Sequence, residues 1–143
     1  MHLLNKPVLS EKISTRVRFD EVDALGIVWH GNYVKYLEDG REAWGRKYGI
    51  PYMTIFREHG FSVPLVKLDM DYKRPLRYEE SCTIETVFVD CEAAKLQLHY
   101  TIYNEAGEVV LKAFSIQVFL TKDGDLQLTL PDFFAEWKRK MGV

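Results

Sequence analysis

Polar and hydrophobic residues alternate along much of this chain, with the period of two that is typical of half-buried β-strands. The first such segment covers residues 14–19. Four more alternating segments follow in the second half, at residues 66–73, 82–88, 96–102 and 114–120. Turn-forming residues at 91–94, 105–108 and 123–124 separate the later segments. Neighbouring strands are therefore expected to be antiparallel.

The period changes to that of a helix from Asn32 onward. The apolar stripe at helical spacing consists of Tyr33, Tyr36, Leu37, Gly40, Ala43, Trp44 and Tyr48. A glycine inside a helix costs about 1 kcal/mol relative to alanine, so Gly40 predicts a close approach of the helix to the sheet. Gly49 and Pro51 end this helix.

Two shorter helices complete the predicted elements. One runs from Pro51 to His59 and stops at Gly60. The other begins at Pro131 and carries an aromatic face that would lie on the sheet. One long apolar helix and about five antiparallel strands bury their apolar faces most simply if the sheet wraps around the helix. The expected class is α+β, with a single domain over residues 1–143.

Composition agrees with one compact domain and narrows the functional classes. Of the 143 residues, 47% are hydrophobic, which is enough to form one core. The net charge is −2 with the cations spread throughout, which argues against nucleic-acid binding. No apolar run is long enough for a signal peptide or a membrane span. Cys82 and Cys91 would face opposite ways, which disfavours a disulfide and fits a cytoplasmic protein.

The candidate chemistry lies just before the long helix. Asp23 stands on a loop of small residues, and the helix begins near Gly31, Asn32 and Tyr33. The first turn of a helix presents backbone N–H groups that can hold a developing oxyanion, and a nearby carboxylate can act as nucleophile or general base. Alternatively, Asp23 only caps a turn or the helix, although Asn32 already suits the capping role.

A resemblance extends this interpretation. The segment from Phe19 to Tyr33 has an acidic residue, a spacer, Asp, a Gly, an apolar triplet and Asn-Tyr, and it resembles the signature of the 4-hydroxybenzoyl-CoA thioesterase-like branch of the hot-dog-fold acyl-CoA thioesterases. The similarity continues from about residue 14 to 138. It implies a hot-dog fold, with a five-stranded antiparallel sheet wrapped around one long central helix. It also implies hydrolysis of an acyl thioester to a free acid and CoA by a homodimer or homotetramer with active sites between subunits.

The resemblance also assigns roles to residues. Asp23 would be the catalytic carboxylate, and the backbone N–H of His30 would polarise the thioester carbonyl, with its imidazole as a second choice. Gly31, Asn32 and Tyr33 would contact the substrate. CoA belongs to the substrate, so no cofactor is expected. Glu21 either orients the loop or, as we favour here, belongs to the solvated surface.

One departure concerns the CoA phosphates. Some family members carry cations on the turn after the third strand, but this chain has Glu92-Ala93-Ala94 there, and its first cation is Lys95. Lys95 is the expected phosphate contact, with Lys73, Arg74 and Arg77 as alternatives. The same departure leaves room for an acyl carrier protein as the thiol carrier.

Other functional classes fit less well. A hot-dog dehydratase would need a catalytic His with an acidic partner. A non-catalytic acyl-CoA-binding protein would lack the acid at position 23. His59 and His99 have no neighbours at metal-ligand spacing, so no metal site is predicted. No nucleophile elbow of the α/β-hydrolase type occurs either.

Overall fold

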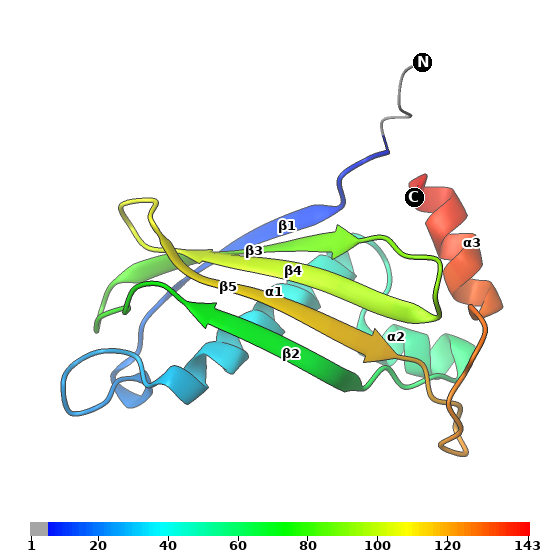
Figure 1. Cartoon of the computed structure of the whole chain (residues 1–143), viewed down its shortest axis with the longest axis horizontal. Coiled ribbons are helices and arrows are strands. Elements are labelled where there is room, and N and C mark those ends of the chain that lie inside the picture. Colours follow the sequence, from blue (N-terminus) through cyan, green and yellow to red (C-terminus); the bar gives the residue numbers. More distant parts are fainter. Residues whose placement is uncertain (1–5) are drawn as a thin grey trace.

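The computed structural model describes residues 6–143 and shows one five-stranded antiparallel sheet (Figure 1). The predicted absence of a signal peptide falls partly on residues 1–5, which lie outside the described residues. The strands follow the spatial order β1-β3-β4-β5-β2. Their bounds are β1 Ser10–Arg16, β2 Leu65–Tyr72, β3 Ser81–Val89, β4 Lys95–Tyr103 and β5 Val109–Val118.

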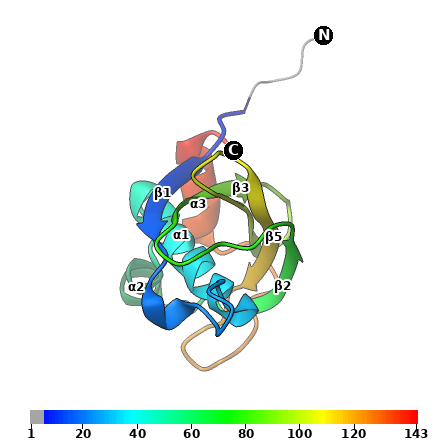
Figure 2. The same cartoon turned by 90° about the vertical axis from the view of Figure 1, so that its left-hand side faces the viewer.

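The long helix α1, Tyr33–Lys47, lies in the hollow of the curved sheet (Figure 2). It packs mainly on β1 and β3. Trp44 is fully buried at this interface. A Cβ atom on Gly40 would lie 2.7 Å from side-chain atoms of Ile84 and Thr86, which confirms the predicted close approach. The expected hot-dog fold, with a sheet wrapped around one helix, is confirmed.

Two predicted elements differ in detail. The first strand spans Ser10–Arg16 instead of residues 14–19, because its pairing with β3 already begins at Ser10, opposite Val87, and a 3-10 turn begins at Phe19. The segment after α1 consists of a three-residue helix α2, Tyr52–Thr54, followed by a π-helical turn, Ile55–His59.

The last strand has its polar residues on the inside. Ser115 and Gln117 are buried, whereas their apolar neighbours Phe114 and Ile116 are half-exposed on the outer face. The reason is hydrogen bonding: the Ser115 hydroxyl lies 2.9 Å from that of Tyr100, and the Gln117 side chain donates to the carbonyl of Val63 at 2.7 Å.

The C-terminal helix α3, Asp132–Met141, covers one end of the sheet and of α1. Its Trp137 side chain donates to the carbonyl of Tyr48 at 2.8 Å and packs against Trp44 and Phe88. Within residues 6–143, no helix has the length and apolar character that a membrane span requires.

Strand β2 forms one edge of the sheet. The backbone N–H and C=O groups on its outer side make no hydrogen bonds to the other four strands. Apolar side chains on this edge remain exposed, with 46% exposure at Leu65 and 58% at Val66. Edge strands with exposed apolar residues favour pairing with another strand.

Candidate active site

The loop between β1 and α1 carries most of the predicted site residues. After Arg16 the chain forms a 3-10 turn, Phe19–Glu21, a tight hairpin around residues 23–27, and a second 3-10 turn, His30–Asn32, that leads into α1. The hairpin is closed by a bridge between Val22 and Val28. This succession of hydrogen-bonded turns gives the loop a defined shape.

Asp23 organises the hairpin with one of its two oxygens. Its Oδ1 accepts a hydrogen bond from the Leu25 N–H at 2.8 Å, and its backbone N–H donates to the Ile27 carbonyl at 2.8 Å. Gly26 closes the turn with a φ of +79°, a conformation that glycine adopts without strain. The second oxygen, Oδ2, accepts no hydrogen bond from the described residues. Asp23 therefore caps a turn, as the structural alternative proposed, and still presents an oxygen for chemistry.

Glu21 is the buried centre of the loop and does not lie on the solvated surface that we favoured from the sequence. The residue is only 5% exposed. One oxygen accepts hydrogen bonds from the Arg18 N–H at 2.8 Å and the Tyr36 hydroxyl at 2.7 Å, and the other lies 3.5 Å from the Lys35 ammonium. Burial alone would raise the pKa of Glu21, but these donors together hold it below its ordinary value. The charged carboxylate thus ties the loop to α1.

The start of α1 is fixed through the backbone of Glu21. The Glu21 carbonyl accepts hydrogen bonds from the Trp29 N–H at 3.0 Å and from the Asn32 side chain at 2.8 Å. The expected capping role of Asn32 is therefore wrong: its side chain makes no cap hydrogen bond to the helix and binds the loop instead. The backbone of the His30–Asn32 turn remains at the N-terminal end of α1, where helix N–H groups lack intrahelical partners.

The turn residues themselves have distinct surroundings. The His30 imidazole is exposed beside the Trp29 ring, and the His30 carbonyl accepts a hydrogen bond from the Tyr72 hydroxyl at 2.8 Å. The Trp29 ring lies directly against Gly31, where a Cβ atom would collide with it. Tyr33 is buried, and its hydroxyl accepts from the Leu76 N–H at 3.2 Å. Its side chain is therefore chiefly part of the core.

A pocket of about 350 Å³ opens beside this turn. Its wall combines apolar side chains with two cations, and it is lined by Ile27, Val28, His30, Tyr33, Tyr72, Lys73, Arg74 and Pro75. Asp23 is not part of this wall, but its hairpin partner Ile27 is. The structure therefore brings His30 and Tyr33 to one pocket, with the Asp23 hairpin along its edge.

Lys95 lies elsewhere. It is the first residue of β4, whereas the loop sits near the other end of the sheet, where Arg16 pairs with Ser81 and Tyr103 ends β4. A nine-residue strand rising about 3.3 Å per residue separates the two ends by roughly 26 Å. Within one protomer, Lys95 is not brought to the other predicted residues, while its alternatives Lys73 and Arg74 line the pocket.

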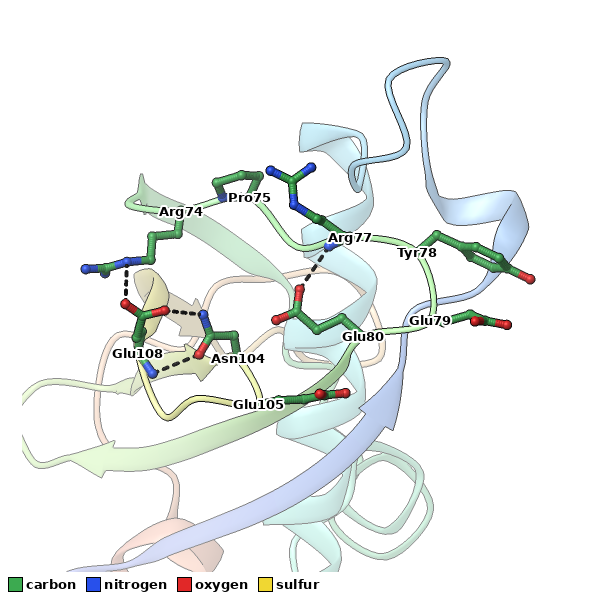
Figure 3. A pocket seen from close by; sticks show the side chains of 9 residues that line it. All are labelled: Arg74, Pro75, Arg77, Tyr78, Glu79, Glu80, Asn104, Glu105 and Glu108. Atoms are coloured by element: carbon green, nitrogen blue, oxygen red, sulfur yellow. Dashed lines mark hydrogen bonds and ion pairs between the residues drawn. The ribbon is translucent and has the colours of Figure 1, made fainter.

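A larger depression of about 570 Å³ lies between the segment of residues 74–80 and the turn of residues 104–108 (Figure 3). Arg74 forms an ion pair with Glu108 there at 3.4 Å, and Glu80 accepts from the Arg77 N–H at 3.1 Å. Carboxylates outnumber cations in this depression, so it suits a phosphate poorly.

The segment that borders this depression supports the loop. The N–H of Tyr78 donates to the carbonyl of Gly26, and a bridge joins Ile27 to Arg77. Glu79 has a φ of 67°, which is rare for a residue other than glycine. The depression is therefore part of the loop's structural support.

The arrangement can support chemistry on a carbonyl carbon. It provides a carboxylate oxygen without a hydrogen-bond donor among residues 6–143, a helix N-terminus that can hold an oxyanion, and a pocket with apolar and cationic walls. Within the same described range, no three His, Cys, Asp or Glu side chains gather as a metal site requires.

Comparisons with known proteins agree on one family. Residues 17–138 match the model of the thioesterase-like superfamily. The chain is 32% identical to a candidate acyl-CoA thioesterase of Bacillus subtilis over 96% of this chain and 94% of that protein. It is 27% identical to the 4-hydroxybenzoyl-CoA thioesterase of a Pseudomonas species over 77% of this chain and 82% of that one. The structure of a DHNA-CoA thioesterase from Staphylococcus aureus has the same fold, with a TM-score of 0.81, 24% identity, and coverage of 91% of this chain and 87% of that chain.

Proposed function

The chain belongs to the thioesterase-like superfamily, and from this membership we propose that it hydrolyses acyl-CoA thioesters to a carboxylic acid and CoA. The observation that carries the proposal is the Asp23 hairpin, which keeps one carboxylate oxygen available on the loop that leads into α1. Relatives whose names specify acyl-CoA or hydroxybenzoyl-CoA thioesters support the substrate class.

The reaction needs only the thioester and water. The carbonyl oxygen would rest on backbone N–H groups of the His30–Asn32 turn, which stabilise the negative charge that develops on it. The Asp23 carboxylate would either attack the carbonyl carbon, giving a mixed anhydride that water then opens, or take a proton from an attacking water. In both routes the carbon–sulfur bond breaks and the thiolate of CoA leaves.

Within one subunit, we assign the CoA phosphates to Lys73 and Arg74; Lys95 would meet them only from a second copy. Lys73 and Arg74 line the pocket beside the His30 turn, whereas Lys95 of the same subunit lies at the far end of the sheet. Lys73 already pairs with Asp71 at 2.7 Å, and Arg74 with Glu108, so each would exchange a surface ion pair for a phosphate. Such exposed pairs are worth about 1 kcal/mol or less.

We also propose that β2 pairs with β2 of a second copy, so that the protein is at least a dimer. The exposed apolar residues Leu65 and Val66 and the unpaired strand edge support this arrangement. A tetramer would be a pair of such dimers. The unpaired thiols of Cys82 and Cys91 suit a reducing cytoplasm, which we propose as the site of action.

A free-thiol assay on purified protein tests the function. Short, long and aromatic acyl-CoAs would be compared with the same acyl groups on acyl carrier protein. Release of CoA from at least one acyl-CoA, with weaker release from the carrier protein, is expected. Faster turnover of the carrier-protein thioesters would reassign the thiol carrier, and binding of acyl-CoA without any turnover would identify a non-catalytic acyl-CoA-binding protein.

A further inference from the structure

Tyr72 connects the end of β2 to the turn that leads into α1 (Figure 1). Its hydroxyl donates a hydrogen bond to the His30 carbonyl at 2.8 Å. The same hydroxyl lies 3.8 Å from the Met70 sulfur, a weak acceptor, so the carbonyl takes its proton. The Tyr72 ring meets the Tyr33 ring edge to face, with 5.5 Å between the centroids. Tyr72 therefore holds the start of the helix from the sheet side.

The His30 carbonyl shares one peptide plane with the Gly31 N–H. No peptide bond among residues 6–143 is cis, so the two groups lie trans to each other and point in opposite directions. A donor that fixes the carbonyl therefore also fixes the direction of the N–H. The hydrogen bond polarises the peptide group as well, which strengthens the N–H as a donor. The Tyr72 hydroxyl thus orients the Gly31 N–H through the peptide plane.

The preceding peptide of the turn is held by the backbone. The Trp29 carbonyl accepts a hydrogen bond from the Asn32 N–H at 2.8 Å, and it shares its peptide plane with the His30 N–H. Within residues 6–143, neither the His30 N–H nor the Gly31 N–H donates to an acceptor. The turn therefore presents two neighbouring N–H groups, one oriented through Asn32 and the other through Tyr72.

We propose that Tyr72 is a positioning residue for thioester hydrolysis, which holds the Gly31 N–H in the direction that lets it donate to the carbonyl oxygen as negative charge develops. The inference rests on the proposed thioesterase function and adds a residue of β2 to its site. The His30 and Gly31 N–H groups are then a pair of oxyanion donors. Because Tyr72 binds the carbonyl at the other end of this peptide, it acts through Gly31 and not by contact with the thioester.

The kinetic test uses Tyr72→Phe, which removes the hydroxyl and keeps the ring that contacts Tyr33. With the best acyl-CoA substrate, kcat should fall about tenfold, which is less than the roughly hundredfold or greater loss that follows removal of an oxyanion donor itself. KM should stay within about twofold of the wild-type value, because the lost stabilisation concerns the transition state. A rise in KM at unchanged kcat would make Tyr72 a substrate-binding residue and overturn the inference.

The matched control is Tyr78→Phe. Tyr78 is 46% exposed, against 47% for Tyr72, and its ring meets the Phe19 ring edge to face at 5.6 Å. Within residues 6–143, however, the Tyr78 hydroxyl makes no hydrogen bond. The kcat and KM of this variant should match those of the wild type. An equal loss of kcat in both variants would overturn the inference, because the Tyr78 hydroxyl holds no carbonyl of the turn.

An NMR measurement tests the peptide itself, independently of turnover. The sequence contains two His-Gly pairs, His30-Gly31 and His59-Gly60. Isotope labels on histidine carbonyl carbons and glycine nitrogens therefore give one carbonyl–nitrogen correlation for each pair. In Tyr72→Phe, the signal of the first pair should move, with its carbonyl carbon shifting upfield as the hydrogen bond is lost. The signal of the second pair is the internal control and should stay in place.

The possible outcomes separate this inference from the proposed function. Hydrolysis by the wild type with an unchanged kcat in Tyr72→Phe, or an unmoved signal of the His30-Gly31 peptide, would overturn the inference and leave the thioesterase function in place. Absence of hydrolysis by the wild type would overturn the proposed function instead, and the NMR comparison would still decide whether Tyr72 holds the peptide.

Discussion

The Glu21 carboxylate accepts a hydrogen bond from the Tyr36 hydroxyl at 2.7 Å, which joins the loop that carries Asp23 to the buried face of α1. The same oxygen also accepts from the Arg18 N–H. Burial and the adjacent carboxylate raise the pKa of Tyr36, so the tyrosine stays protonated and remains a donor. The hydrogen bond from Tyr36 to the charged Glu21 carboxylate therefore fixes the loop to α1.

Removing this hydrogen bond should lower the free energy of unfolding by more than the loss of an exposed side-chain hydrogen bond does. In a double-mutant cycle with Glu21→Gln and Tyr36→Phe, we expect a coupling free energy of about 1.5–3 kcal/mol, as for buried hydrogen bonds to charged groups. Urea unfolding of the four proteins gives the value. The matched pair Glu85→Gln and Tyr103→Phe, whose wild-type side chains form a hydrogen bond on the other face of the sheet, should couple by about 1 kcal/mol or less. Equal coupling free energies in both cycles would show that the buried Glu21–Tyr36 hydrogen bond is no stronger than the one between Glu85 and Tyr103.

Glu21 also predicts a pH dependence. Its pKa is lower in the folded protein than its ordinary value of 4.5, so its contribution to stability is complete above that value and is lost as the pH falls through the folded pKa. The difference in free energy of unfolding between wild type and Glu21→Gln should be constant near neutral pH and shrink below about pH 4.5. Asp90, whose pKa is also lowered, is present in both proteins and cancels. A difference that grows on acidification would contradict the assignment.

The periodic elements could be predicted because their signals are local. The stripe from Tyr33 to Tyr48 and the position of Gly40 predict α1 and its contact with the sheet without knowledge of the partners. The burial of Glu21 could not be predicted, because its partner Tyr36 lies fifteen positions away on another element. The sequence offers one local clue. Glu21 lies three residues after Arg18, a spacing at which a glutamate side chain can accept a hydrogen bond from the earlier residue's backbone N–H.

Long-range pairing also explains the other differences. Gln117 is buried because its side chain hydrogen-bonds to Tyr52 and Val63, which lie on distant segments of the chain. The alternation of polar and apolar residues in β5 alone therefore predicts the wrong face for the core. Lys95 is separated from Asp23 by the direction of β4, which depends on the topology of the sheet. The local pattern predicts that the Asn32 side chain caps its own helix. It cannot reveal that this side chain binds the carbonyl of Glu21, which lies eleven residues earlier.

Two backbone positions near the loop should respond in opposite directions to substitution. Gly26 has a φ of +79° and open space around it, so Gly26→Ala should destabilise by about 1–2 kcal/mol through backbone strain alone. Glu79 has a φ of 67°, so Glu79→Gly should stabilise, by up to about 1 kcal/mol. Thermal unfolding of both variants checks the pair. If Glu79→Gly destabilises the protein, the interactions of the Glu79 side chain stabilise the fold by more than the backbone strain destabilises it.

The most direct test of the account is Asp23→Asn, assayed with the best acyl-CoA substrate. Asparagine retains the oxygen that accepts from the Leu25 N–H, so the hairpin and the free energy of unfolding should change by no more than about 0.5 kcal/mol. Thioester hydrolysis should fall roughly a hundredfold to ten-thousandfold, because the catalytic carboxylate is lost. Asp20→Asn, on the same loop and exposed, is the matched control and should retain wild-type turnover. Near-normal hydrolysis by a folded Asp23→Asn protein would contradict the central claim.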